Sequence, residues 1–340
     1  MHLTALVESP EHVCCRYRLA AFRPWLAQAG HTLELLCWPR TWWGWARLGS
    51  RLRGTDVVIL QRRLLNPWQR YLVRRAARYL VFDFDDAVFL RDSYAAKGLH
   101  SARRLRRFHA LVRSADAVVA GNSFLARQTA RAGRLPRLRV IPTCVDPRRY
   151  PVAQHRRTDN QVELVWVGSS STLRGLYSLC PVLEGVGRAW HPSAGLRLKL
   201  ICDRFFTLRH VDVRPCPWTE EGEAREIAAA DIGISWLPDD LWSRGKCGLK
   251  VLQYMAAGLP VVANSVGVQA DLVRHGETGY LADTPEQWAD ALVCLGSDAG
   301  LRRRLGQAGR RRVEEAFGVA VGAAAWTELL HEVRPRQRVA

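Results

Sequence analysis

Short apolar runs alternate with amphipathic stretches along most of the chain. In the first half, the runs of strand type are 3–7, 32–37, 56–60, 80–84, 116–120 and 138–142. In the second half, they are 162–168, 196–202, 231–235 and 260–263. Segments with helical spacing, such as 101–115 and 123–133, lie between them. Because short apolar strands that alternate with helices are typical of parallel sheets covered on both faces, the pattern predicts an α/β chain with two Rossmann-like domains.

The length of the chain and one polar segment predict where the domains meet. Its 340 residues suffice for two domains of about 150 residues each. Residues 146–161 are rich in Pro, Arg and polar side chains, and we take them as the linker. We therefore expect an N-terminal domain over 1–150, a C-terminal domain over 151–316, and a helix within 317–340 that packs back towards the N-terminal domain. Because ligands of parallel sheets bind at the carboxyl ends of the strands, we expect both sheets to face a central cleft that holds the active site.

The composition is that of a globular protein, with 48% hydrophobic and 24% charged residues. No apolar run reaches the ~18 residues that a membrane-spanning helix needs, and the N-terminal stretch lacks the basic start and apolar core of a signal peptide. The nine cysteines are scattered without a C-x-x-C pair, which indicates neither a disulfide framework nor a zinc site. We expect reduced thiols, a cytoplasmic location and no metal or other cofactor.

The positive charge is concentrated in the first half of the chain. Residues 1–150 contain 27 Arg and Lys against 10 Asp and Glu, a balance of +17, whereas residues 151–340 contain 23 against 22, a balance of +1. A general preference for arginine would act on both halves. The asymmetry therefore favours an anionic partner for the first half, which could be a membrane surface, a polyanionic acceptor or nucleic acid.

One helical segment of the first half, 101–115, has the character of a membrane-surface helix. Arg103, Arg106, Arg107 and Arg113 recur near helical spacing, with Leu and Phe side chains between them. We predict that the N-terminal domain docks on an anionic membrane surface, at the inner face of the membrane, to reach a lipid-linked or envelope saccharide. The alternative is a helix whose Leu and Phe face covers the sheet while its arginines are merely solvated.

Two of the four lysines of this arginine-rich chain, Lys246 and Lys250, lie at the start of "GKCGLKVLQYMAAGLPVVA", residues 245–263. The segment predicts a helix that ends at Gly258 before a strand. The two lysines lie at positions i and i+4, so their ammonium groups would project from the same side of the first turns of the helix. Cations at the N-terminus of a helix interact unfavourably with the helix dipole, and this arrangement costs stability unless an anion binds there. We interpret them as a phosphate site, with a pair of solvated surface lysines as the alternative.

Several motifs together resemble the retaining glycosyltransferases of family 4, also called glycosyl transferases group 1. The motifs are "NSFLARQTARAG" (122–133), "LRVIPTCVDPRRY" (138–150), "WVGSSSTLRGL" (166–176), "GKCGLKVLQYMAAGLPVVA" (245–263) and "NSVGVQADLVRHGETGYLA" (264–282). The resemblance implies the GT-B fold and the transfer of a sugar from a nucleotide-diphosphate sugar to a saccharide or lipid-linked acceptor. It also implies retention of configuration and a reaction that needs no metal.

The donor-binding candidates come from these motifs and from "PCPWTEE" (215–221). They are Gly168, Ser169, Arg174, Trp218, Lys246, Cys247, Gly248, Leu249, Lys250 and Gln253. The paired glutamates of the family fall on Gly245 and Gln253, and its phosphate-binding arginine falls on Ser169. The two lysines would then replace a lost cation, Gln253 would offer an amide to the ribose, and Trp218 would stack on the base.

The acidic cluster "FDFDDAVF" (82–89) follows an apolar run, at the carboxyl end of a predicted strand. Asp83 and Asp85 would face one side of that strand. We take Asp85 and Asp86 as catalytic candidates that act on the acceptor hydroxyl or as a general base, and Lys250 as the catalytic candidate that stabilises the leaving diphosphate. A D-x-D metal site is a less favoured interpretation, and helix capping with pairing to arginines such as Arg91 is the structural alternative.

Two arginines after the first strand, Arg16 and Arg18, are the acceptor-binding candidates, because family members place an acceptor-side loop there. A solvated helix face is the alternative.

Two other classes of protein stay open: a nucleotide-sugar epimerase of the same fold, and a non-catalytic or nucleic-acid-binding descendant. No RNA-binding module or helix-turn-helix signature occurs, and the donor motifs would then be unexplained, so we expect no nucleic-acid partner.

Overall fold

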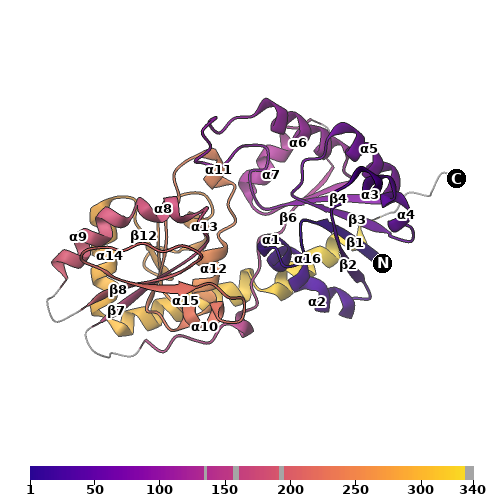
Figure 1. Cartoon of the computed structure of the whole chain (residues 1–340). Coiled ribbons are helices and arrows are strands. Elements are labelled where there is room, and N and C mark those ends of the chain that lie inside the picture. The colour runs from indigo at the N-terminus through magenta and orange to yellow at the C-terminus, as the bar shows by residue number, and fades with distance from the viewer. Residues whose placement is uncertain (134–135, 156–160, 191–194, 334–340) are drawn as a thin grey trace. The chain divides into compact units, whose positions relative to one another are not determined.

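The chain forms two compact units in the computed structural model, which describes residues 1–133, 136–155, 161–190 and 195–333 (Figure 1). The N-terminal unit comprises Met1–Cys144, Asp240–Cys247 and the chain from Val319 onwards. The C-terminal unit comprises Val145–Asp239 and Gly248–Gly318. The expected boundary after residue 150 therefore lies inside the C-terminal unit. Residues 156–160 of the expected linker and 334–340 of the expected C-terminal segment lie outside the described residues.

Six parallel strands form the sheet of the N-terminal unit, in the order β2-β1-β3-β4-β5-β6. Their bounds are β1 (His2–Val7), β2 (Thr32–Cys37), β3 (Val57–Gln61), β4 (Tyr79–Phe84), β5 (Ala117–Ala120) and β6 (Arg137–Val140). Every residue of the central strands β3 and β4 is buried, because helices cover both faces. This burial explains why the strands appear as continuous apolar runs in the sequence.

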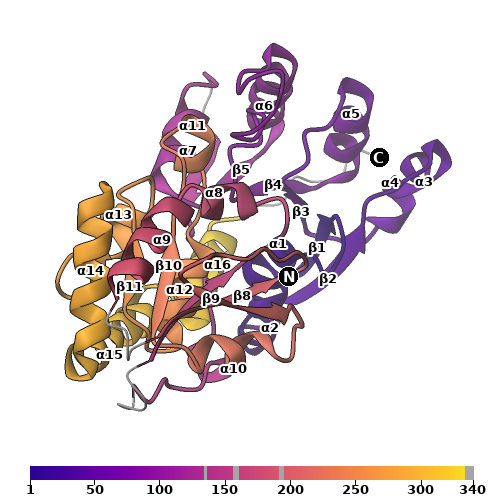
Figure 2. The ribbon, with the colours of Figure 1, turned by 60° about the vertical axis from the view of Figure 1, so that its left-hand side comes forward.

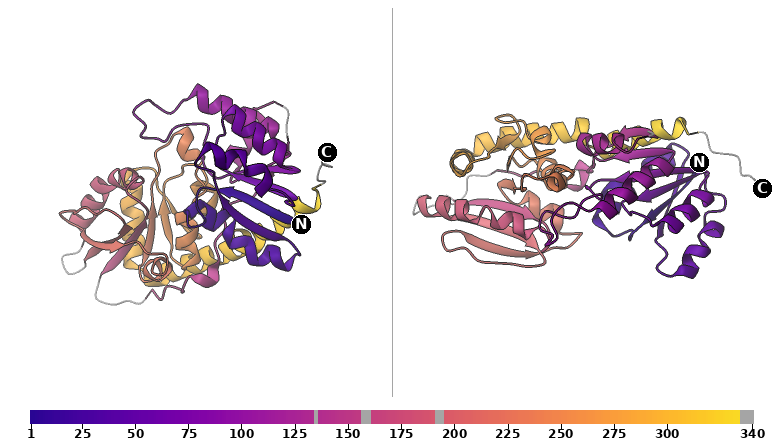
Figure 3. Two further views of the ribbon diagram at one scale, coloured as in Figure 1. Left: turned by 45° about the vertical axis from the view of Figure 1, so that its right-hand side comes forward. Right: turned by 90° about the horizontal axis from the view of Figure 1, so that it is seen from above.

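Two layers of helices cover this sheet. One layer consists of α3 (Trp42–Ala46), α4 (Leu48–Arg51), α5 (Pro67–Ala76), α6 (Ala102–Ser114) and α7 (Ser123–Ala130). The other consists of α1 (Val13–Arg18), the 3-10 turn η1 (Ala20–Phe22), α2 (Arg23–Gln28) and α16 (Val319–His331). The yellow C-terminal helix α16 lies beside the indigo N-terminal elements (Figure 3), where its Trp326 is 1% exposed. The short helix α11 (Leu241–Arg244) also belongs to this unit.

The C-terminal unit contains a second sheet of six parallel strands, in the order β12-β11-β10-β7-β8-β9. Their bounds are β7 (Val162–Val167), β8 (Leu196–Cys202), β9 (Asp212–Pro217), β10 (Ile232–Ser235), β11 (Val261–Ala263) and β12 (Gly279–Leu281). The sequence pattern does not predict β9 and β12. Both are edge strands: β9 contains two prolines, which only an edge tolerates well, and β12 has three residues.

Helices also accompany the second sheet (Figure 2). They are the 3-10 turn η2 (Pro147–Arg149), α8 (Leu173–Tyr177), α9 (Cys180–Ala189), α10 (Glu223–Ala228), α12 (Leu249–Ala256), α13 (Gln269–Leu272), α14 (Pro285–Ser297) and α15 (Ala299–Ala316). Val251–Ala256 of α12 are all buried, since this helix packs on β10 and against α10 and α15. Within the described ranges, no helix is long and apolar enough to cross a bilayer.

Candidate active site

The helix that carries the lysine motif begins later than the sequence indicates. α12 starts at Leu249, and its N-cap is Gly248 with a left-handed φ of 69°. The position also lacks space for a side chain, because an added Cβ would lie 2.3 Å from Cδ1 of Leu272. Lys246 therefore precedes the helix. The prediction that Lys246 and Lys250 project together from its first turns is wrong, because the left-handed glycine redirects the chain between them.

Lys250 is the second residue of α12 and keeps its expected place at the start of the helix. Its ammonium group lies over the indole of Trp166, 3.8 Å from the ring centroid. The same indole lies against Gly168, where an added Cβ would come within 2.3 Å of the ring. One buried ring thus joins the start of α12 to the loop after β7. Gly168 is required here because a side chain would displace the indole.

Hydrogen bonds fix the loop that follows β7. The hydroxyl oxygen of Thr172 accepts from the N–H of Ser169 at 3.2 Å. Ser170 donates to the Asp203 carboxylate from its N–H at 2.6 Å and from its hydroxyl at 2.8 Å. The hydroxyl bond, and then the N–H bond, lower the pKa of Asp203. Because Asp203 follows β8, these bonds tie together two neighbouring loops at the carboxyl edge of the sheet, where ligands of such sheets bind.

The other donor candidates of the C-terminal unit lie at the same edge of its sheet. Leu249 is the first residue of α12, and Arg174 is an exposed residue of the short helix α8. Trp218 directly follows β9 and is 42% exposed, and its indole N–H donates to Glu223 at 2.8 Å. Their roles stay predictions. Trp218 in particular is exposed enough to offer a stacking surface for a base.

Gln253 is far less accessible than a ribose-binding role suggests. It is 2% exposed, and its amide nitrogen donates to the hydroxyl of Tyr150 at 3.2 Å. The side chain therefore takes part in the packing between α12 and the segment that enters the unit.

We predict that Gln253→Glu lowers the melting temperature in the absence of donor, because it places a carboxylate in a buried site. The cost should be about 1–3 kcal/mol, as for other buried polar groups that lose a partner. Differential scanning calorimetry of Gln253→Glu and of the uncharged control Gln253→Met measures it. An unchanged melting temperature for Gln253→Glu would contradict the prediction and favour a ribose role.

The two remaining donor candidates, Lys246 and Cys247, belong to the N-terminal unit, and their role in donor binding stays a prediction. The Asn122 side chain donates to the carbonyl of Lys246 at 3.0 Å. The thiol of Cys247 donates to the carbonyl of Asp85 at 3.2 Å, and burial raises its pKa. Gly121 admits the thiol, because an added Cβ there would lie 2.4 Å from the Cys247 sulfur.

Four charged side chains form a cluster at the carboxyl ends of β3 and β4, which we call the carboxylate cluster: Arg62, Asp85, Asp86 and Lys246. The Lys246 ammonium lies 3.0 Å from one oxygen of Asp86, and Arg62 pairs with the other. The Nε of Arg62 lies 3.4 Å from Asp85. The side chains of Asp85 and Asp86 are 12% and 11% exposed. The sequence predicted the place of these carboxylates, whereas their cations come from distant segments.

Arg91, the arginine that the sequence offers as a partner, does not pair with the acidic residues. It donates instead to the carbonyl oxygens of Lys97 and Gly98, both at 3.1 Å. This arginine therefore closes its own surface loop, and the cluster depends on Arg62 and Lys246.

Arg62 occupies an unusual backbone conformation. Its φ is 58°, in the left-handed region that non-glycine residues seldom adopt. Such a conformation costs roughly 1–3 kcal/mol and persists only where the surroundings fix it. Here its N–H donates to the carbonyl of Asp83 at 2.8 Å, while its guanidinium holds Asp85 and Asp86. Burial alone would raise the pKa of Asp85, but Arg62 and then Arg18 outweigh burial and lower it, so this carboxyl is ionised.

Arg18 is not an acceptor-binding residue, because it is 1% exposed and pairs with the fully buried Asp83. Its Nε donates to both oxygens of that carboxylate at 3.1 Å, and its Nη1 donates to the carbonyl of Ile141 at 3.0 Å. The pair thus joins α1, β4 and the chain after β6 beneath the carboxylate cluster. Arg16 is partly buried, and its guanidinium carbon lies 5.5 Å from the ring centroid of Tyr17.

Three residues of these sites were missed by the sequence analysis: Trp166, Asp203 and Arg62. Trp166 stands two residues before the glycine of its motif, and Asp203 directly follows an apolar run. Both positions at strand ends could have drawn attention to them. Arg62 offers no such signal, because it is one arginine among many.

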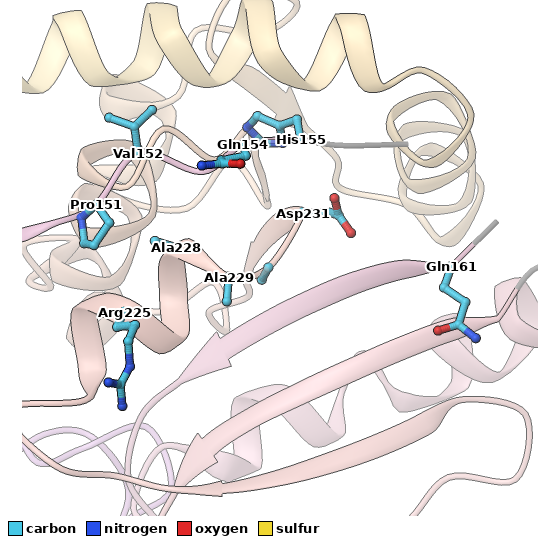
Figure 4. Close-up of a pocket in the computed structure, with 10 residues that line it drawn as sticks. Pro151, Val152, Gln154, His155, Gln161, Arg225, Ala228, Ala229 and Asp231 are labelled. Carbon is cyan, nitrogen blue, oxygen red and sulfur yellow. The ribbon is translucent and has the colours of Figure 1, made fainter. Parts of the chain in front are cut away.

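A pocket in the C-terminal unit lies at the opposite edge of the sheet (Figure 4). It is lined by residues of the segment before β7, by the end of α10 and by Asp231 before β10. The Asp231 carboxylate accepts from the N–H of Glu163 at 2.9 Å and lies 3.3 Å from Nη2 of the buried Arg302. These are the amino ends of β7 and β10, so the pocket is not at the predicted ligand edge.

Comparison with solved structures defines the class of fold. A sucrose-phosphate synthase from Thermosynechococcus elongatus matches with a TM-score of 0.75 at 17% identity, over 98% of each chain. HepE from Anabaena, solved in complex with UDP-glucose, matches with a TM-score of 0.67 at 15% identity, over 98% of this chain and all of that one. The fold is that of the GT-B glycosyltransferases, as predicted.

The family model of glycosyl transferases group 1 matches residues 196–298, which include α12 and its lysine. The predicted resemblance to that family is confirmed over this part of the chain. A D-inositol 3-phosphate glycosyltransferase of Xylanimonas cellulosilytica is 37% identical in an alignment 254 positions long, which covers 67% of this chain and 59% of that protein. Other curated relatives are matched over about a fifth of their own length, for example 19% of an N-acetyl-alpha-D-glucosaminyl L-malate synthase of Bacillus anthracis.

Proposed function

We propose that this protein is a glycosyltransferase that moves a sugar from a nucleotide-diphosphate sugar to a saccharide or lipid-linked acceptor. The observation that carries the proposal is the arrangement of Lys250, Trp166 and Gly168 at the carboxyl edge of the second sheet, within and beside the family-matched segment. The C-terminal unit would hold the donor, and the N-terminal unit would hold the acceptor.

The donor diphosphate would bind where α12 begins. The N–H groups of the first turn point out of the helix start, and Gly248 has no side chain to cap them. Lys250 adds a full positive charge to this end, and the exposed Arg174 can add another. Positive groups at this place stabilise the negative charge that grows on the diphosphate as the sugar leaves. Trp218 would stack on the base of the nucleotide.

The acceptor would bind at the carboxylate cluster of the N-terminal unit. Asp85 and Asp86 are ion-paired yet remain 12% and 11% exposed, so they can accept hydrogen bonds from sugar hydroxyl groups. Arg62 and Lys246 hold them in place and keep the local charge balanced. The lowered pKa of Asp85 suits an acceptor of hydrogen bonds better than a donor.

We infer transfer with retention and without a metal. The acceptor hydroxyl would attack the anomeric carbon on the face that the phosphate leaves. The bond from that carbon to the phosphate oxygen breaks as the new glycosidic bond forms. The hydroxyl proton passes to the departing phosphate oxygen, so no protein nucleophile is required. The fixed cations of the donor site take the part that a metal ion plays elsewhere.

A thermal-shift screen against UDP-, GDP- and ADP-sugars tests the donor. A donor at about 100 times its Kd should stabilise the protein by about 2.7 kcal/mol, and EDTA should not remove the effect. The free nucleoside is the control, because it lacks the diphosphate that Lys250 is proposed to hold. No stabilisation by any of the nucleotide sugars would contradict the proposal.

A transfer assay with the donor so identified separates the candidate reactions. Radiolabelled sugar should appear in a saccharide or lipid extract when membranes are supplied, and the anomeric configuration of the product should equal that of the donor. Free sugar released at a steady rate without acceptor would favour an epimerase of the same fold instead.

A further inference from the structure

Large aromatic side chains are exposed on two helices of the N-terminal unit. Four large aromatic side chains of α3 and α5 are exposed: Trp42 by 60%, Trp43 by 59%, Trp68 by 46% and Tyr71 by 61%. The two helices belong to the same layer and contact each other, and Trp68 meets the buried Trp45 of α3 edge to face, with the ring centroids 5.9 Å apart. Exposed tryptophans in such a group mark a site of interaction.

The sequence around these aromatic side chains is rich in arginine. From Arg40 to Arg78 it contains ten arginines and one acidic residue, Asp56, and in the structure three of these arginines, Arg62, Arg74 and Arg78, pair with carboxylates. Asp56 is itself paired with Arg78, at 3.5 Å. Arg40 lies just before α3, and Arg47 lies one turn after Trp43, and both are exposed. We call the group Trp42, Trp43, Trp68, Tyr71, Arg40 and Arg47 the aromatic–arginine surface.

We propose that the aromatic–arginine surface docks on an anionic lipid bilayer, with Trp42 and Trp43 entering the headgroup region. Tryptophan and tyrosine favour the bilayer interface, because an apolar ring there keeps a polar end in contact with water. The arginines complement the negative headgroups. A neutral sugar would instead call for carboxylate or amide partners beside the rings. The helices α3, α4 and α5 carry no Asp or Glu, and the side-chain oxygen of Gln69, their one amide, accepts from the N–H of Asn66 in the helix cap.

This surface replaces α6 as the membrane-inserting element predicted from the sequence. Most of the large apolar side chains of α6 lie in the core: Phe108 and Leu111 are 0% exposed, whereas Leu105 is 42% exposed. α6 therefore follows the alternative in which it covers the sheet. It packs beside α5, so its exposed arginines extend the positive charge next to the aromatic–arginine surface. The docking itself does not depend on the proposed function. Only the purpose of docking, which is to reach a lipid-linked acceptor, rests on it.

Sedimentation of the full chain with lipid vesicles tests the proposal without any need for catalysis. Vesicles of phosphatidylcholine alone are compared with vesicles that contain one third phosphatidylglycerol, each at low and at high salt. We expect binding to the anionic vesicles only, and loss of that binding at high salt. Because the donor screen measures a different property, vesicle binding can fail while the glycosyltransferase proposal holds, and the reverse.

Two pairs of variants assign the binding to this surface. Trp42→Ala with Trp43→Ala should weaken partition onto anionic vesicles by roughly ten-fold or more, since both side chains are removed from the interface. Arg40→Gln with Arg47→Gln should weaken it by roughly 25-fold, at about five-fold for each charge. The controls are Tyr177→Ala, an aromatic residue that is 47% exposed in the C-terminal unit, and Arg303→Gln with Arg304→Gln on α15.

Three results with vesicles would overturn the proposal. They are absence of binding to both kinds of vesicle, equal binding to neutral and anionic vesicles, and wild-type binding by the Trp42→Ala, Trp43→Ala variant. Binding of soluble oligosaccharides that depends on these tryptophans, without vesicle binding, would also overturn it and assign the surface to an acceptor glycan.

Discussion

Replacing Arg18 by methionine is expected to destabilise the protein by about 3–5 kcal/mol, because it leaves the carboxylate of Asp83 buried without its cation. Arg18 and Asp83 are 1% and 0% exposed, so water cannot take the place of the guanidinium. The substitution also removes the donor to the carbonyl of Ile141. Urea denaturation of the variant measures the loss.

The double variant Arg18→Met, Asp83→Leu separates two free energies: the cost of leaving one buried charge unpaired, and the net contribution of the ion pair to stability. Replacing both partners by apolar side chains should recover most of the loss, because the buried charge is then gone. As a surface control, Arg148→Gln should cost little stability, since Arg148 pairs with Asp146 while 74% exposed, where water screens the pair. A loss in Arg18→Met no larger than that of this control would contradict the assignment.

The two sheets could be predicted from the sequence because burial on both faces makes a parallel strand a continuous apolar run. β3 and β4 are the clearest cases, since each of their residues is buried. The same physics explains the failure at β9, where Pro215 and Pro217 leave a pattern that resembles a loop. An edge strand needs ladder hydrogen bonds on one side only, and it can therefore keep residues that a central strand excludes.

The candidate site could be predicted only where it depends on residues close in the sequence. Lys250 lies where the motif places it, because the start of α12 is set locally by Gly248. Lys246 does not lie where the motif places it. Its position was inferred from helical spacing, but the helix begins only after Gly248. The burial of Arg18 could not be predicted, because its partner Asp83 is 65 residues away in the sequence. The sequence alone does not distinguish a buried arginine from a solvated one.

The exposed tryptophans illustrate a third limit. Trp42, Trp43 and Trp45 occur together, and any of them could fill a core. Only Trp45 does so, at 3% exposure, while the other two face outwards. A sequence shows that a large apolar side chain is present, whereas its burial depends on which neighbours the fold supplies.

Lys250→Ala is expected to reduce kcat/KM for sugar transfer by about ten- to a hundred-fold, with little loss of folding. A charge-assisted bond to a diphosphate is worth roughly 1.5–3 kcal/mol, and that contribution is lost with the ammonium group. Its effect on stability should be smaller, since a cation–π contact such as the one with Trp166 is worth about 0.5–1 kcal/mol at a partly exposed site. The measurement uses the donor found by the thermal-shift screen.

Two other lysines provide the controls that make this result specific. Lys97→Ala removes an exposed lysine of the N-terminal unit and should leave transfer unchanged. Lys246→Ala should raise the KM for acceptor rather than for donor, because Lys246 pairs with Asp86 in the carboxylate cluster. If Lys250→Ala keeps wild-type kinetics, or if Lys246→Ala weakens donor binding as strongly as Lys250→Ala does, then the start of α12 is not the diphosphate site. The cations of the donor site would then have to come from elsewhere in the chain.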